Sequence, residues 1–156
     1  SARLFSTKMP VLIDIGFSDI ILPVPQEIRY PTLLAMPEPT LLGYTLETVI
    51  AEKLQSVVKL ALVNTRMKDF YDLWTIIKNH EIQKDKLGIV IRKVFANLKT
   101  TLKTPVAFTE AFYHNKATQK RWNNFLTSMG KEPVKLENII VELSKFTSVF
   151  FESGPT

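Results

Sequence analysis

The clearest hydrophobic pattern of the chain spans residues 45–77 and predicts two helices joined by a short polar turn. Along the first helix the apolar residues recur at i, i+3, i+4 and i+7, the spacing of a side that faces a core. This apolar stripe consists of Leu46, Val49, Ile50, Val57, Val58 and Ala61. Thr45 is a suitable N-cap for the first helix, and Asn64 or Thr65 for the second, because their side-chain oxygens can accept a first-turn N–H.

The second half of the chain continues with helical periodicity. Three more apolar stripes lie within residues 87–98, 122–129 and 136–150, with a short helical turn ending near Phe112. Pro105 ends the first of these stripes and Gly130 the second, as expected for residues that stop helices. Residues 45–156 are therefore predicted to form a mainly α-helical domain.

The first 44 residues show a different pattern. Residues 9–15 alternate between apolar side chains and Asp14, and residues 19–23 form a second apolar run that ends at proline, so the two runs predict an antiparallel hairpin. A third strand is expected near residues 41–44. Four prolines within residues 25–43 predict an extended connector there and exclude a helix. The fold class is therefore α+β, with short antiparallel strands and a connector in residues 1–44 before the helical domain.

Composition narrows the class of protein. The chain has 156 residues, enough for one sizeable core. It has no cysteine, which excludes disulfides and thiolate metal sites and agrees with a cytoplasmic location. No apolar run has the length of a membrane span, and no signal-peptide core is present near residue 1, so we expect no membrane partner.

The net charge of +5 is unevenly distributed. Residues 80–135 contain 11 lysines and arginines against 4 aspartates and glutamates, a net charge of +7, and the rest of the chain has a net charge of −2. Such a basic segment favours an anionic partner, above all nucleic acid. The alternative is a set of solvated helix faces with no common ligand.

One cation and two anions within the helical pair are candidates for chemistry. Lys53 falls inside the apolar stripe, where an ammonium needs a partner or a route to water. Asp69 and Asp72 lie on one side of the next helix at i, i+3. A structural ion pair would explain this arrangement, and so would a binding site. Arg66 and Lys68 in the first turn oppose the helix dipole, which an anionic ligand or an acidic neighbour would justify.

Four stretches that contain these residues resemble the AbiEii/AbiGii nucleotidyltransferase toxin family. They are IDIGFSD (13–19), YPTLLAMPEPTLLGYTLETVIAEKLQSVV (30–58), NTRMKDFYDLW (64–74) and VAFTEAFYHNKATQKRWNNFL (106–126). The resemblance implies a nucleotidyltransferase-like sheet, of which the strands here are a remnant, followed by a helical domain. It also implies a toxin–antitoxin function, transfer of a nucleotide from an NTP with Mg²⁺, an acceptor such as tRNA, and a cognate antitoxin as partner.

The resemblance also assigns roles to individual residues. Asp14 matches the acid of the family's third metal-site strand, where it would bind Mg²⁺ or accept the proton of the attacking hydroxyl. Lys53 matches a lysine that would bind NTP phosphates. Asp69 matches an acid that would orient Lys53 or a nucleotide hydroxyl. The implied nucleotide-binding residues also include Arg66, Lys68 and Asp72. Asp72 lies one helical turn after Asp69, and for it a structural role is favoured.

One motif of the family has no counterpart in this sequence. The glycine–hydroxyl pair and the Asp-x-Asp strand precede the Asp14 strand in the family, and residues 1–8 do not contain them. We therefore expect the chain to be the C-terminal part of such a protein, inactive as given. The alternative is a non-catalytic module in which the helices bind an antitoxin or RNA.

Overall fold

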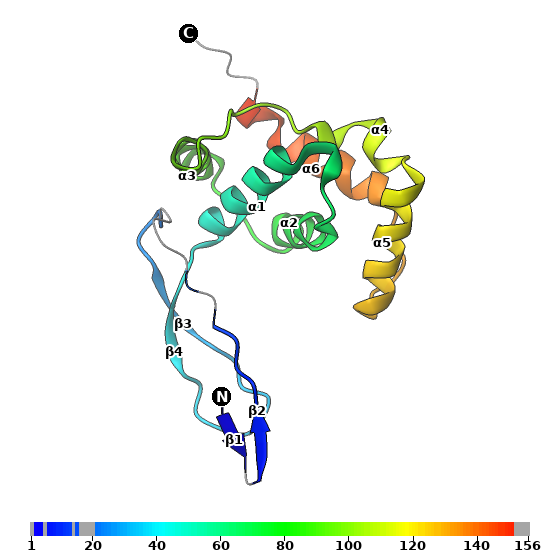
Figure 1. Ribbon diagram of the computed structural model, residues 1–156. Helices are drawn as coiled ribbons and strands as arrows, with labels where there is room; N and C mark the ends of the chain where they lie inside the picture. Colours follow the sequence, from blue (N-terminus) through cyan, green and yellow to red (C-terminus); the bar gives the residue numbers. More distant parts are fainter. Residues whose placement is uncertain (1, 5, 14, 16–20, 152–156) are drawn as a thin grey trace.

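The computed structural model of the chain describes residues 2–4, 6–13, 15 and 21–151. In this part of the chain, two β-hairpins precede six α-helices. Figure 1 shows the described residues up to residue 44, which we call the arm, extending away from the helices. The fold is α+β and rich in helix, as the sequence pattern predicts.

The arm contains two separate two-stranded antiparallel sheets. β1 (Ala2–Leu4) pairs with β2 (Thr7–Met9), and β3 (Gln26–Arg29) pairs with β4 (Thr40–Gly43), so that Gln26 lies opposite Gly43. β4 confirms the strand expected near residues 41–44. Many large apolar side chains of the arm remain exposed, for example Leu12 at 87% and Leu42 at 73%.

The predicted hairpin of residues 9–15 and 19–23 is wrong. β2 ends at Met9, and residues 10–13 are not in a strand. Pro10 explains this end, because proline has no N–H to donate to a ladder. Residues 21–23 are also irregular, while Asp14 and residues 16–20 lie outside the described residues.

The proline-rich connector is extended, as predicted, but it is folded back into the β3–β4 hairpin. Its prolines occupy the positions that a ladder tolerates. Pro25 directly precedes β3, and the other three, Pro31, Pro37 and Pro39, lie in the loop between β3 and β4. None of them removes a hydrogen bond from the paired residues.

The helical part is built around α1 (Leu46–Leu60), which packs against α3 (Lys84–Asn97) and α2 (Met67–Asn79). The Thr45 side chain accepts a hydrogen bond from the backbone N–H of Thr48 at 3.4 Å, which confirms the predicted cap. The Thr48 hydroxyl donates in turn to the backbone oxygen of Leu22, so the segment of the arm between β2 and β3 is hydrogen-bonded to the first turn of α1.

The buried side of α1 is slightly rotated from the predicted stripe. Ile50, Val57 and Val58 are buried as predicted, whereas Leu46, Val49 and Ala61 are only partly buried. Ala51 and Leu54 occupy the centre of the buried side instead. Lys53 therefore lies at the edge of the buried side, from which its ammonium reaches α2.

The remaining helices complete a single hydrophobic core. They are α4 (Glu110–Tyr113), α5 (Lys116–Ser128) and α6 (Leu136–Phe151), with 3-10 turns η1 (Ala61–Val63) and η2 (Val106–Phe108) between helices. Gly130 follows α5 with a φ of 58°, a left-handed conformation that suits glycine, and so confirms the predicted helix stop. Trp122 of α5 donates from Nε1 to the backbone oxygen of Val134 at 2.7 Å, which holds α5 to the segment before α6.

No helix in the described ranges is long and apolar enough to cross a membrane.

Candidate functional site

Lys53 bridges α1 and α2 through its ammonium. Its side chain is 21% exposed, and Nζ donates to Asp69 Oδ1 at 2.9 Å and lies 2.8 Å from Asp72 Oδ2. The i, i+3 spacing of the two aspartates on α2 brings both carboxylates to the same ammonium. The structure therefore brings together the cation and the two anions that the sequence singled out.

Each aspartate also has a second cationic neighbour at the start of α2. Arg66 Nε lies 2.8 Å from Asp69 Oδ2, and Lys68 Nζ donates to Asp72 Oδ2 at 2.6 Å. We refer to Lys53, Arg66, Lys68, Asp69 and Asp72 as the ion-pair cluster, which has one more cation than anion. The acidic neighbours account for the two cations in the first turn of α2, where the helix dipole alone would disfavour them.

Arg66 is also the N-cap of α2, and its side chain forms no capping hydrogen bond in the described part of the chain. The prediction that Asn64 or Thr65 would be the cap is therefore wrong. The buried Asn64 side chain instead accepts the backbone N–H of Arg66 at 2.8 Å, which shapes the turn before the helix. This turn positions the Arg66 guanidinium beside Asp69.

The two aspartates differ in burial and in their free acceptor capacity. The Asp69 side chain is 3% exposed and that of Asp72 is 22% exposed. Although Arg66 Nε is close to Asp69 Oδ2, the approach lacks hydrogen-bond alignment, and this buried oxygen has no hydrogen-bond donor among the described residues. The charge on this oxygen is therefore balanced by the Arg66 guanidinium and not by a hydrogen bond.

Two members of the cluster, Lys53 and Asp72, keep their charges over a wide pH range. Burial lowers the pKa of Lys53, but its hydrogen bonds with Asp72 and Asp69 outweigh burial, so the net pKa is raised above the ordinary 10.5. Burial raises the pKa of Asp72, but hydrogen bonds from Lys53 and Lys68 outweigh it, and the net pKa is below the ordinary 3.8. The ammonium of Lys53 and the carboxylate of Asp72 are thus both charged at neutral pH.

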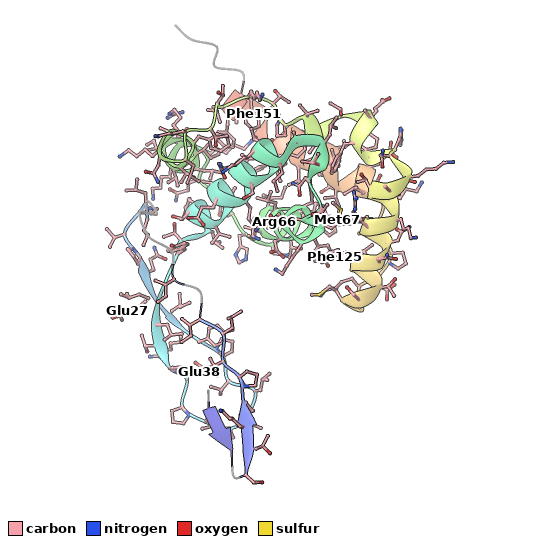
Figure 2. All side chains as sticks on the ribbon, in the orientation of Figure 1. Glu27, Glu38, Arg66, Met67, Phe125 and Phe151 are labelled. Atoms are coloured by element: carbon pink, nitrogen blue, oxygen red, sulfur yellow. The ribbon has the colours of Figure 1, made fainter. Side chains whose placement is uncertain are left out.

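A groove of about 750 Å³ opens beside the cluster, between the start of α2 and α5. Lys53 and Asp69 line one part of it, and Arg66 and Met67 stand on the α2 wall opposite Phe125 of α5, as Figure 2 shows. The complete lining comprises Lys53, Thr65, Arg66, Met67, Lys68, Asp69, Arg121, Asn124, Phe125 and Ser128. Four cationic side chains against one carboxylate give this lining a positive net charge.

Sequence reasoning did not single out the α5 wall of this groove. Arg121, Asn124, Phe125 and Ser128 follow an i, i+3, i+4, i+7 spacing and so share one side of the helix. Phe125 falls within the apolar stripe of residues 122–129, and Arg121 falls within the basic segment of residues 80–135. A search for polar residues beside the apolar stripe of α5 would have found this side.

The basic segment does not form one surface. Lys84, Lys86, Arg92 and Lys93 belong to α3, whereas Arg121 belongs to α5. Figure 1 shows these helices at opposite ends of the helical part, with α1, α2 and α6 between them. The net charge of +7 is therefore divided between two sides of the molecule.

The described residues do not fit a metal ion by themselves. They contain no group of three or more metal-ligating side chains, and the carboxylates of Asp69 and Asp72 each lie within 3 Å of ammonium or guanidinium nitrogens. Asp14, the predicted metal ligand, lies outside the described residues.

Comparison with known protein families gives a match over most of the chain. Residues 2–142 match the family described as AbiEii, the nucleotidyl transferase AbiEii toxin of a Type IV TA system. No curated protein and no solved structure matches the chain significantly.

Proposed function

Because the chain belongs to the AbiEii family of nucleotidyl transferase toxins of type IV toxin–antitoxin systems, we propose that its ion-pair cluster binds the NTP whose nucleotide is transferred. The observation that carries this proposal is the position of Lys53, a mostly buried ammonium that lines a cationic groove. Two of its three N–H bonds point to Asp69 and Asp72, which leaves one donor for a phosphate oxygen.

The other residues of the cluster have complementary roles in this proposal. Arg66 and Lys68 are exposed enough to contact phosphates, with side chains 58% and 63% exposed. Asp69 orients Lys53 through Oδ1, and Asp72 holds Lys53 and Lys68 in place. The phosphates of the NTP are negatively charged before and during transfer. The fixed cations of the cluster stabilise this charge and so lower the barrier to transfer.

Mg²⁺ binding and proton transfer would fall to residues outside those that the structure describes. The resemblance assigns Asp14 to Mg²⁺, and the described carboxylates do not substitute for it because cations already surround them. Mg²⁺ would stabilise the charge on the reacting phosphates. The cations of Lys53, Arg66 and Lys68 would neutralise the remaining negative charge of the nucleotide phosphates.

We also propose that residues 1–44 belong to the nucleotidyltransferase sheet and residues 45–156 to the helical domain. Two-stranded hairpins are marginal in water, and the exposed apolar side chains of the arm favour packing against further sheet. These 156 residues contain no Asp-x-Asp pair, so we expect no transfer from them alone. The acceptor is tRNA, the partner a cognate antitoxin, and the location the cytoplasm.

A transfer assay with two forms of the protein tests these proposals. The 156-residue chain and a longer form that carries the Asp-x-Asp motif are incubated with labelled NTP, Mg²⁺ and bulk tRNA. Only the longer form should label RNA, and Lys53→Met should abolish the label. Lys59→Met is the matched control, because Lys59 is an exposed lysine of the same helix.

The outcomes separate the proposals from the non-catalytic alternative. Label produced by the 156-residue chain would refute its inactivity. Full activity of Lys53→Met in the longer form would return Lys53 to a structural ion pair. If neither form transfers a nucleotide while the chain still binds RNA or an antitoxin, the helical part is a binding module.

A further inference from the structure

The groove beside the ion-pair cluster has a second wall, formed by α5, that the proposed NTP site does not use. Arg121, Asn124 and Ser128 of α5 line this wall. Arg121 is exposed and forms no ion pair with a carboxylate in the part of the chain that the structure describes. Its guanidinium is therefore available to a ligand.

The two walls differ in what already neutralises their cations. On the α2 wall, Arg66 and Lys68 each have an aspartate within 3 Å. On the α5 wall, Arg121 has no such neighbour in the described ranges, and the polar side chain of Asn124 stands beside it. In addition to the single excess positive charge of the ion-pair cluster, the groove thus has on α5 a cation with no carboxylate neighbour among the described residues.

The groove is an open depression of the surface and not an enclosed cavity. Its volume of about 750 Å³ is in the upper part of the usual range for a small-ligand site, roughly 300 to 1,000 Å³. A nucleic-acid strand passing through such a groove would place its phosphates against arginine and amide donors, the groups that most often contact a phosphate backbone.

We propose that the α5 wall binds the phosphodiester backbone of the acceptor RNA, with Arg121 as its principal contact. This inference rests on the proposed function, in which the ion-pair cluster at the other wall binds the NTP. The RNA would enter along α5, and its end would approach the nucleotide held near Lys53. The α3 side of the molecule, at the opposite end of the helical part, would not contact this strand.

The test measures binding of a short single-stranded RNA to the 156-residue chain over a range of salt concentrations. Arg121→Gln should weaken binding roughly tenfold and reduce the salt slope by about one, the loss of one charged phosphate contact. Lys120→Gln on the outer side of α5 and Lys93→Gln on α3 remove the same charge outside the groove and should change affinity little. Thermal unfolding of each variant verifies that the fold is kept.

A parallel titration with Mg-NTP distinguishes the phosphate of RNA from that of the NTP. Arg121→Gln should leave NTP binding unchanged. Loss of NTP affinity with RNA affinity kept, equal weakening of RNA binding by all three variants, or no RNA binding at low salt would each overturn the inference. The proposed function fails separately, by transfer that persists in Lys53→Met.

Discussion

The Lys53–Asp69 pair offers the most direct measurement of what the ion-pair cluster contributes to stability. The perturbation is a double-mutant cycle of Lys53→Met and Asp69→Asn, because methionine keeps most of the volume of lysine and asparagine keeps the shape of aspartate. The cycle isolates the free energy of coupling between the two side chains from the effects of each change alone.

The expected magnitude follows from burial. Lys53→Met removes a 2.9 Å hydrogen bond from a carboxylate whose side chain is only 3% exposed. Breaking a buried pair costs about 3 to 5 kcal/mol when the remaining charge has no compensation. Here Arg66 remains 2.8 Å from the other oxygen, and the desolvation cost of the lysine disappears, so we expect a loss of about 1 to 3 kcal/mol.

The control cycle uses Lys68 and Asp72, a pair on the same helix. The Lys68 side chain is 63% exposed, so its 2.6 Å contact is screened by water. We expect a coupling below about 0.5 kcal/mol for this pair and at least about 1 kcal/mol for Lys53 and Asp69. Urea unfolding monitored by circular dichroism, at neutral pH and fixed salt, gives all the required free energies.

The result that would refute this reasoning is equal, weak coupling in both cycles. Coupling of less than about 0.5 kcal/mol between Lys53 and Asp69 would mean that water screens the pair as it screens surface pairs. The burial of Asp69 would then have no energetic consequence for its pair with Lys53.

Three further predictions concern pH, capping and core hydrogen bonding. Because the pKa of Asp72 is lowered, its carboxylate stabilises the fold at pH values above the ordinary pKa of 3.8, and this stability is lost as the pH falls below that value. Because the pKa of Lys53 is raised, its ammonium stabilises the fold at pH values below 10.5, and this stability is lost at higher pH. The urea midpoint, measured across pH, should therefore fall at low and at high pH, and each fall should be smaller in Lys53→Met. Falls of unchanged size in this variant would contradict the assignment. Thr45→Ala should lower stability by about 1 kcal/mol because α1 loses its cap, whereas a change at exposed Thr101 should have little effect. Trp122→Phe should cost about 1 to 3 kcal/mol in chemical unfolding, since the Val134 oxygen loses its 2.7 Å donor, and a neutral result would mean that water replaces it.

The sequence by itself determined the helices and the chemistry of their residues. A period near 3.6 shows which side of a helix is buried, and this local property predicted α1, α2, α3, α5 and α6, whereas α4 was expected as a short helical turn. The same spacing placed Asp69 and Asp72 on one side of α2, within reach of Lys53. The family resemblance also came from these local motifs, and the family match over residues 2–142 confirms it.

The tertiary structure decided which segments meet. Strand pairing joins residues far apart in sequence, and alternation alone does not specify a partner, so the β3–β4 hairpin was missed and Pro10 ended the predicted strand. The approach of α5 to α2 depends on the packing of Trp122 and the turn at Gly130, which periodicity does not encode. The groove and the exposed Arg121 therefore became visible only when the helices were packed together.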